Sequence, residues 1–173
     1  DNVAIGKDAL KLSTTASNNT AVGRSALTAN TTGAQNVAVG FESLKAHTTS
    51  NDCVAVGWQS QLSSTTGAAN VSIGGGSLRT VTTSSNNVAI GNASQYLNTS
   101  ANNTSVGAET LRYNTTGSEN TAIGKSALSS VTTGEGNTAI GYESGAYNNN
   151  YPTTGNNNTI LGAYSRLSAA AQN

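Results

Sequence analysis

One apolar pattern repeats along the whole chain. A five-residue phrase, Asn, Val or Thr, Ala or Ser, Val or Ile, and Gly, first occurs as Asn2-Val3-Ala4-Ile5-Gly6. It occurs ten times with few departures, and successive phrase glycines are 17, 17, 17, 17, 17, 16, 17, 17 and 21 residues apart. The phrase glycines are Gly6, Gly23, Gly40, Gly57, Gly74, Gly91, Gly107, Gly124, Gly141 and Gly162. So regular a period predicts a stacked repeat architecture, and it is too short for a helical-hairpin repeat.

The second repeat, residues 19–35, shows how one unit is built. Its phrase alternates and ends at Gly23, which predicts a short strand followed by a turn. Ala26-Leu27 adds a second apolar position, Thr31-Thr32 suits a strand and Gly33-Ala34-Gln35 a loop. Glycine and paired β-branched threonine recur too often for a helix. We therefore predict an all-β parallel solenoid of about ten 17-residue coils, with two or three short strands in each.

Alternation along the phrase assigns its residues to two faces of the strand. We predict that the second and fourth positions, such as Val37 and Val39, face the interior of the coil. The third position is Ala or Ser in nine copies and Ile160 in the tenth, and it would face outward. A row of small side chains lets another backbone approach closely, so this row is the predicted subunit interface. The alternative is that it is only a narrow corner of the coil.

The first and last phrase positions predict structural roles. Each glycine is expected where φ is positive or where a corner is too tight for a Cβ atom. Coils stack about 4.8 Å apart, so the leading asparagines should form a hydrogen-bonded ladder. The ladder residues are Asn2, Asn19, Asn36, Asn70, Asn87, Asn103, Asn120, Asn137 and Asn158. Cys53 takes this position in the fourth copy, and we expect a tolerated small substitute rather than a reactive thiol.

Two repeats depart from the 17-residue period. One repeat is one residue short, and its leucine stands later than in the other repeats, in the segment Ser94-Gln95-Tyr96-Leu97. We predict that the leucine position is shifted in this coil. The repeat after Gly141 carries a four-residue excess around residues 147–152. Insertions in solenoids form loops on one face, so this segment is either a specialised surface loop or a neutral insertion.

Composition narrows the possible functions. Hydrophobic residues make up 35% of the 173 residues and charged residues 9%, which fits a thin solenoid core that relies on backbone ladders. Eight basic and eight acidic residues give zero formal net charge, which argues against nucleic acid and anionic membrane surfaces. No apolar run approaches the ~20 residues needed to span a bilayer. A single cysteine allows no internal disulfide.

Residues with catalytic or metal-binding chemistry are sparse. The only histidine, His47, lies in a variable stretch and is expected on the solvated surface. The carboxylates are scattered, and neither a zinc spacing nor the repeated aspartate of calcium-binding solenoids occurs. Gly74-Gly75-Gly76 lacks the Lys-Ser or Lys-Thr that would complete a phosphate loop. We therefore predict no enzymatic activity, no cofactor and no metal.

The residue after each phrase glycine is the most variable. Phe41 and Trp58 hold this position in adjacent coils, so their rings should lie about 4.8 Å apart on one stripe that also carries Lys7, Arg24 and Tyr142. Exposed aromatic rings beside polar neighbours can hold a sugar ring. Phe41, Trp58 and Tyr142 are therefore candidate glycan contacts, and packing against an adjacent subunit is the alternative.

Three segments resemble known surface-fibre repeats: Asn103-Thr104-Ser105-Val106-Gly107, Asn114-Thr115-Thr116-Gly117, and Asn120-Thr121-Ala122-Ile123-Gly124-Lys125-Ser126-Ala127-Leu128. They are similar to the head repeats of YadA-like trimeric autotransporter adhesins and, more closely, to the longer coils of bacteriophage tail fibres. The resemblance covers essentially the whole chain. It implies a left-handed parallel β-roll, three chains around one axis, and an extended fibre outside the cell. The 17-residue coil exceeds the adhesin head repeat, which favours the tail-fibre reading.

We therefore expect residues 1–173 to form a single repeat domain within a longer fibre protein. Its function would be the trimeric shaft or head of a phage tail fibre or a related attachment fibre, on a virion or a bacterial surface. The expected partners are further copies of the chain and a host-surface glycan or protein, with no nucleic acid and no membrane insertion. The alternatives are a bacterial adhesin head, or a glycan- or ice-binding solenoid. The recurring threonine pairs suggest ice binding, but neighbours in a strand face opposite ways, so one row would face water.

Overall fold

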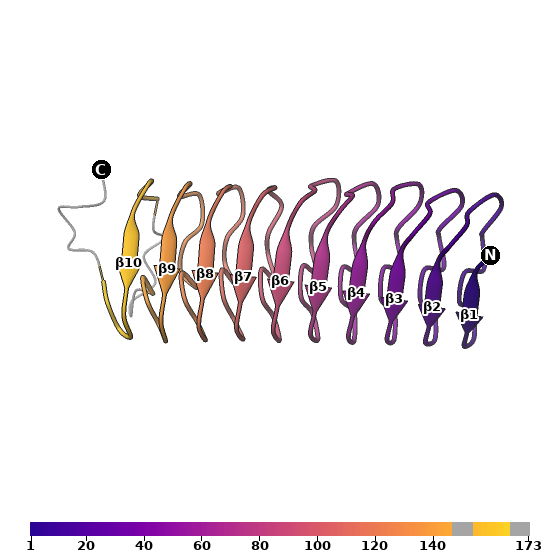
Figure 1. Cartoon of the computed structure of the whole chain (residues 1–173), viewed down its shortest axis with the longest axis horizontal. Helices are drawn as coiled ribbons and strands as arrows, with labels where there is room; N and C mark the ends of the chain where they lie inside the picture. The colour runs from indigo at the N-terminus through magenta and orange to yellow at the C-terminus, as the bar shows by residue number, and fades with distance from the viewer. Residues whose placement is uncertain (147–153, 167–173) are drawn as a thin grey trace.

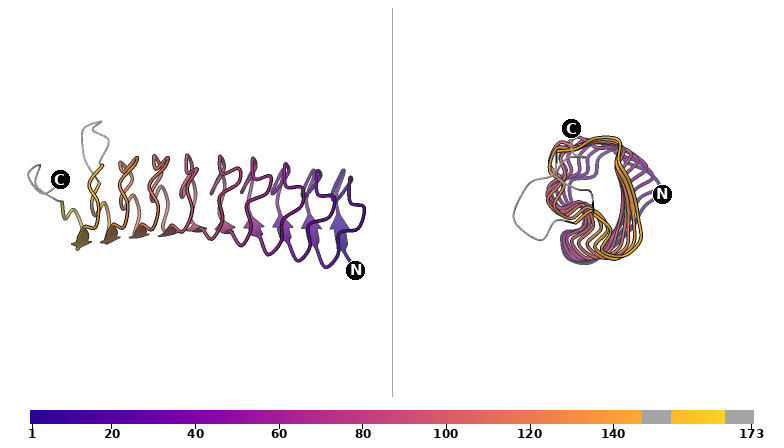
Figure 2. Two further views of the ribbon diagram at one scale, coloured as in Figure 1. Left: turned by 90° about the horizontal axis from the view of Figure 1, so that it is seen from above. Right: turned by 90° about the vertical axis from the view of Figure 1, so that its left-hand side faces the viewer.

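The computed structural model describes residues 1–146 and 154–166 and forms a rod of stacked coils (Figure 1). Each phrase contributes one three-residue strand, and the ten strands pair in parallel in chain order. The strands are β1 (Val3–Ile5), β2 (Thr20–Val22), β3 (Val37–Val39), β4 (Val54–Val56), β5 (Val71–Ile73), β6 (Val88–Ile90), β7 (Thr104–Val106), β8 (Thr121–Ile123), β9 (Thr138–Ile140) and β10 (Thr159–Leu161). Viewed along the rod, the coils lie over one another (Figure 2).

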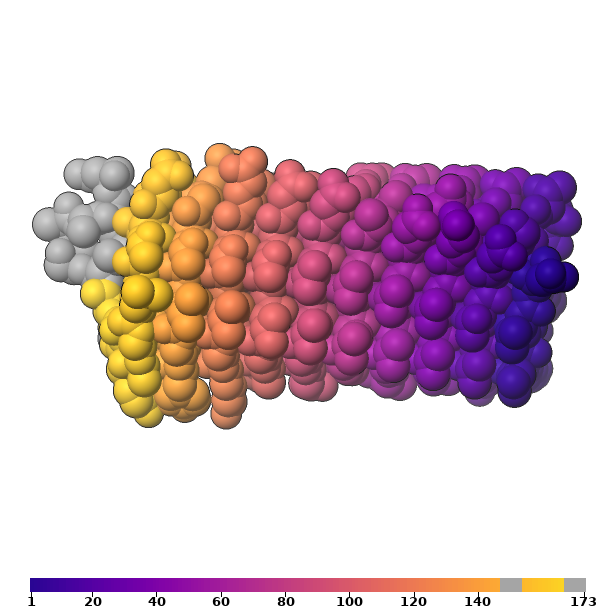
Figure 3. Space-filling model, viewed as in Figure 1, coloured from indigo at the N-terminus to yellow at the C-terminus, as the bar shows by residue number. Residues whose placement is uncertain are grey.

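The predicted all-β parallel solenoid is confirmed, but the predicted strand content is wrong. Over the described residues each coil holds one strand, and turns and bends make up the rest of the coil. Hydrogen bonds between coils continue outside the strands, as from the Leu27 N–H to the Ser43 carbonyl (3.0 Å). The turns stack in register even though they are not extended, and in the space-filling view the coils form parallel ridges across the rod (Figure 3).

The 16-residue coil keeps the leucine position in register, so the predicted shift is wrong. The Leu78 N–H donates to the Ser94 carbonyl, and the Gln95 N–H donates to the Thr110 carbonyl. Gln95 therefore takes the place that Leu78 holds one coil earlier. The missing residue falls between Thr99 and Asn103, where a turn can shorten without moving the core. The predicted insertion around residues 147–152 lies outside the described residues.

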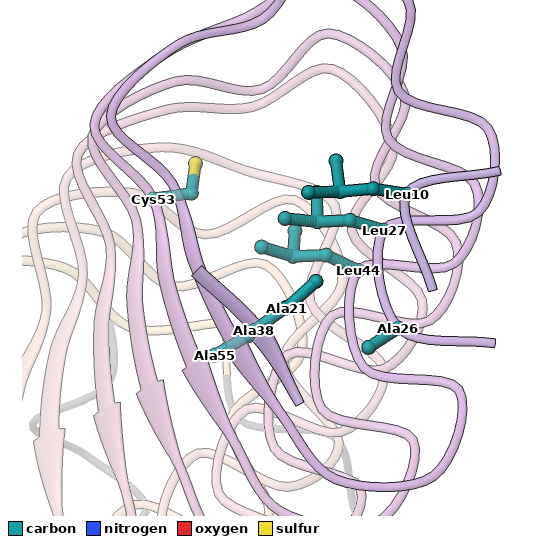
Figure 4. Packing of buried hydrophobic residues seen from close by; sticks show 8 residues of the cluster. All are labelled: Leu10, Ala21, Ala26, Leu27, Ala38, Leu44, Cys53 and Ala55. Atoms are coloured by element: carbon teal, nitrogen blue, oxygen red, sulfur yellow. The ribbon is translucent and has the colours of Figure 1, made fainter. Parts of the chain in front are cut away.

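The two faces of the sheet are the reverse of those predicted. The third phrase positions, such as Ala21, Ala38 and Ala55, are fully buried and point toward a row of leucines, Leu10, Leu27 and Leu44, on the opposite wall (Figure 4). The second and fourth positions point outward. The prediction that Val and Ile fill the interior, and that the Ala/Ser row forms a subunit interface, is therefore wrong. The coil is so thin that leucine from one wall leaves room only for Ala or Ser on the other.

The row of leucines and the facing row of Ala and Ser at the third phrase position vary together across the core. A change of size or polarity in one row is matched by a change in the other. Two glutamines replace leucine, and each donates through Nε2 to a serine that replaces alanine on the facing strand. These pairs are Gln61 with Ser72 (2.8 Å) and Gln95 with Ser105 (2.9 Å). Where the small row instead carries Ile160, the leucine row carries Gly145, on which an added Cβ would lie 2.9 Å from Ile160 Cδ1. Volume and hydrogen bonding are therefore matched coil by coil.

Candidate functional site

The outward face of the ten-stranded sheet is uncharged along the whole rod, and one of its two rows is wholly apolar. Its two rows carry Val or Thr and Val, Ile or Leu, and none of the ten strands places a charged residue there. Ile73 is 40% exposed and Ile140 42%, with the intervening coils half-buried or exposed in the same way. Parallel sheets are ordinarily covered on both faces, and a contiguous apolar surface marks an interaction site. This outward sheet face is the most extensive candidate interaction surface of the described residues.

The phrase glycines end each strand where the chain turns sharply. All ten have φ between +104° and +137°, a region that side chains rarely adopt. The corners also stack closely, because a Cβ built on Gly40 would lie 2.4 Å from the carbonyl oxygen of Gly57 in the next coil. Both the backbone conformation and the contact between coils therefore require glycine.

The phrase asparagines run along the inside of the rod as a ladder. The Asn36 N–H donates to Asn19 Oδ1 (2.9 Å), and Asn36 Oδ1 accepts the N–H of Cys53 (3.0 Å). Asn36 Nδ2 also donates to the Ser50 carbonyl (3.0 Å). Cys53 interrupts the ladder, because its thiol reaches the Gly67 carbonyl (3.2 Å) but brings no amide. Burial raises the pKa of the Cys53 thiol to about 11, so it is an unreactive structural residue.

His47 is fully buried, so the prediction that it is a solvated surface residue is wrong. It occupies an interior row with Asn30 and Ser64, and its Nε2 lies 2.9 Å from the Ser50 carbonyl oxygen. Burial lowers the pKa of His47, which favours the neutral imidazole. The ring is part of the core and is not available to a substrate.

The aromatic side chains on the outside of the rod mostly lie under cations. The cation–π pairs are Arg24 over Phe41 (5.7 Å), Arg79 over Tyr96 (5.5 Å), Arg112 over Tyr113 (5.5 Å) and Lys125 over Tyr142 (6.0 Å). Tyr164 packs edge-on against Tyr142, with ring centroids 5.1 Å apart. A hydrogen bond to Glu143 raises the pKa of Tyr142 to about 12. Trp58 is 55% exposed and differs from these rings, because no ring or cation within the described residues covers it.

Phe41 and Trp58 hold equivalent positions in adjacent coils, and Tyr142 lies farther along the same row. The Gln59 N–H donates to the Phe41 carbonyl (2.9 Å), and the Gly76 N–H donates to the Trp58 carbonyl (2.8 Å). Of the three candidate glycan contacts, the structure therefore brings two side by side and leaves Tyr142 apart from them. Their backbone spacing follows from the period, but the cations over Phe41 and Tyr142 were not anticipated.

A chain of polar side chains beside Trp58 escaped sequence reasoning. Gln59 Nε2 donates to Glu42 Oε2 (2.8 Å), Arg79 Nε donates to Gln59 Oε1 (3.1 Å), and Arg79 Nη1 donates to the Tyr96 hydroxyl (2.8 Å). A hydrogen bond from Lys45, 2.6 Å from Glu42 Oε1, is the main cause of the lowered pKa of Glu42. Glu42 and Gln59, like Arg79 and Tyr96, are one 17-residue coil apart, and Arg79 is three residues more than a coil from Gln59. The 17-residue period could therefore have predicted that these side chains are neighbours.

The threonine pairs form two rows that both reach the surface. The first row is tied down, since Thr31 Oγ1 donates to the Thr48 carbonyl (3.2 Å) and Thr48 Oγ1 to the Thr65 carbonyl (3.0 Å). The second row, which includes Thr32 and Thr49, is exposed. Because these residues lie in bends and not in a strand, the expectation of a single water-facing row is wrong. The first-row hydroxyl protons already serve the contacts between coils.

The part of the chain that the structure describes contains neither a candidate metal site nor a candidate membrane-spanning helix. Residues 1–146 and 154–166 contain no group of three or more His, Cys, Asp or Glu side chains arranged to hold a metal ion. Within the same ranges no helix has the length and hydropathy needed to cross a bilayer. No family model, curated protein or solved structure matches this chain.

Proposed function

We propose that this chain is a structural segment of an extracellular attachment fibre in which three copies associate through their outward sheet faces. The observation that carries the proposal is the uncharged outward surface along all ten strands, with its unbroken row of Val, Ile or Leu. An all-parallel sheet with one face open to water is unusual, and burying that face supplies the driving force for association.

A second and third copy of the same chain are the partners that fit this face best. A partner must present an apolar strip as long as the rod, with matching corrugation, and another copy does so by construction. The zero formal net charge of the chain removes long-range repulsion between copies. The number three rests on the resemblance to trimeric fibre repeats. In such an arrangement each sheet covers parts of both neighbours, and the exposed Val and Ile side chains form a core around the axis.

The role of such a fibre segment is mechanical. The strands lie across the rod, so the hydrogen bonds between coils run along its length (Figure 1). Strand pairs, turns and the asparagine ladder then share an axial load. The segment sets the reach and stiffness of a fibre on a virion or a bacterial surface. The coil length favours the tail-fibre version over a bacterial adhesin head.

A charge placed on the outward face tests the proposal. Val39→Lys and Ile73→Lys each put an ammonium into the proposed interface, where an unpaired charge is costly. Both side chains point away from the core, so each chain should still fold. We expect light scattering to give assembled wild type and dissociated variants with unchanged far-UV circular dichroism. Thr66→Lys, at an exposed site outside the strands, is the matched control and should assemble. Full assembly of both interface variants would reject the proposed interface.

A further inference from the structure

Two glycines leave the surface beside Trp58 without side chains. Gly75 and Gly76 stack on Trp58 and Gln59 of the preceding coil, and the following coil places Asn92 over Gly75. A Cβ built on Gly75 would meet only Asn92 Nδ2 at 3.2 Å and the Trp58 carbonyl oxygen at 4.0 Å. Neither contact is a backbone clash like those at the phrase glycines. Packing therefore does not require glycine at position 75, and the coil after Trp58 carries no side chain at the equivalent position.

Trp58 is the one described aromatic side chain without a ring or cation partner. Phe41, one coil earlier in the same row, has Arg24 across its face. At the Trp58 position the row continues into glycine, so the indole stays 55% exposed. An uncovered indole presents a flat apolar surface and a ring N–H donor, which together suit a ligand with one apolar face and a polar rim.

Polar groups with fixed directions surround this surface. Asn92 Nδ2 donates to the Gly75 carbonyl (3.2 Å), which leaves the amide oxygen available to a ligand. The Tyr96 ring lies over Gly76, since its Cε2 would be 3.3 Å from a Cβ there. Arg79 is held between Gln59 and the Tyr96 hydroxyl through Nε and Nη1, and no hydrogen bond from its Nη2 occurs within residues 1–146 and 154–166. An acceptor therefore lies two coils along the row of Trp58, and a donor is bound to Gln59, the residue that follows Trp58.

We propose that Trp58, Gly75, Gly76 and Asn92 form a binding site for a pyranose ring of a surface glycan. The C–H face of the sugar stacks on the indole, and the glycine backbone gives the ring room. Its equatorial hydroxyls donate to the Asn92 amide oxygen and accept from Arg79. One chain contains every residue of this site, so the proposal does not depend on the fibre assembly.

The row that carries Trp58 is unsuited to a dry contact between copies. It bears Lys7, Arg24 and Lys125 in other coils, whereas the outward sheet face bears no charge. An interface between rods would also repeat in each coil, as the Val and Ile rows do. The uncovered indole with its glycine pair occurs once, which is the pattern of a ligand site.

The chain contains a single tryptophan, so its fluorescence reports on this site alone. The assembled protein would be titrated with lactose, cellotetraose and chitotetraose. We expect saturable quenching or a shift of the Trp58 emission with at least one of them. Gly75→Leu covers the indole without a strained backbone and should weaken binding at least about tenfold, as for the loss of an aromatic contact surface. Ala163→Leu, at an exposed position of the same row six coils from Trp58, adds a similar side chain away from the site and should bind normally.

Several results would overturn the site. One is an unchanged Trp58 emission with all three sugars up to about 10 mM, because a dissociation constant above that value would mean no useful affinity. Another is equal sugar binding by the wild type and Gly75→Leu. Trp58 shielded from acrylamide in the assembled protein would make it a subunit contact, which rejects the sugar site but leaves the fibre proposal intact. Sugar binding by a monomeric chain would support the site while rejecting the fibre.

Discussion

Replacing Cys53 with asparagine should stabilise the protein. Cys53 keeps one ladder bond, from its N–H to Asn36 Oδ1 (3.0 Å), and a weak thiol contact with the Gly67 carbonyl (3.2 Å). The next ladder residue, Asn70, turns its N–H toward the sulfur, which is a poor acceptor. In Cys53→Asn the new Oδ1 would accept the Asn70 N–H and the new Nδ2 would donate to Gly67, as the asparagines do in the other coils.

The gain can be worked out from the bonds exchanged. Each amide hydrogen bond contributes about 1 kcal/mol net, and relieving a poorly satisfied buried donor adds about 1 kcal/mol more. Loss of the apolar thiol from the core offsets about 1 kcal/mol. The net stabilisation is about 1–2 kcal/mol. In a chain of this size each kcal/mol moves the melting temperature by about 2–4 °C, so a rise of about 2–8 °C is expected.

The assay is thermal unfolding followed by far-UV circular dichroism at one fixed protein concentration, because assembly makes the melting temperature concentration-dependent. Hydrogen exchange at the Asn70 amide gives a residue-level readout and should slow in Cys53→Asn. Cys53→Ala, which removes the thiol and supplies no amide, is the control and should melt below wild type. A Cys53→Asn protein that melts no higher than wild type, with unchanged exchange at Asn70, would refute the ladder reasoning.

Three further perturbations test the core. The pKa of His47 is lower in the folded chain than in the unfolded chain, so the stability contributed by its neutral form is present above about pH 6.5 and is lost as pH falls from there through the folded pKa. Urea unfolding should show this loss of stability in the wild type and a smaller loss in His47→Asn. Equal losses in the two proteins would contradict the role of His47. Gly57→Ala places a Cβ 2.6 Å from the Gly74 carbonyl oxygen at φ +137° and should cost at least about 3 kcal/mol, whereas Gly75→Ala should cost little; equal melting temperatures would reject the corner argument. Gln61→Leu and Ser72→Ala should each destabilise the protein while the double variant recovers the Leu44–Ala55 type of pair, with a coupling of about 1–2 kcal/mol in a double-mutant cycle of urea unfolding, and additive effects would argue against a matched pair.

The period and the alternation predicted the solenoid but not which face lies inside. Alternation fixes which residues share a face, and it does not say which face is buried. We assigned the larger side chains Val and Ile to the interior, as in an ordinary sheet. The coil interior is instead filled by leucine from the opposite wall, so Ala and Ser fit beside it. The sequence held the signal in its matched exceptions, Gln61 with Ser72 and Gly145 with Ile160, which make sense only across a shared core.

The surroundings of individual side chains were harder to predict from the sequence than the positions of residues along the backbone. The position of His47 in its coil matches Asn30 and Ser64, which could have marked it as interior. The cation over Phe41, and its absence over Trp58, depend on side-chain directions that a period does not specify. Spacing therefore gave the row of candidate contacts, and the structure was needed to single out Trp58.

The solution mass of the chain, measured by light scattering coupled to size exclusion, tests the central claim most directly. That claim is that the outward sheet face is an interface between copies. The account predicts about 52 kDa, three times the 17.3 kDa chain. A mass of one chain, together with a folded β spectrum, would contradict it.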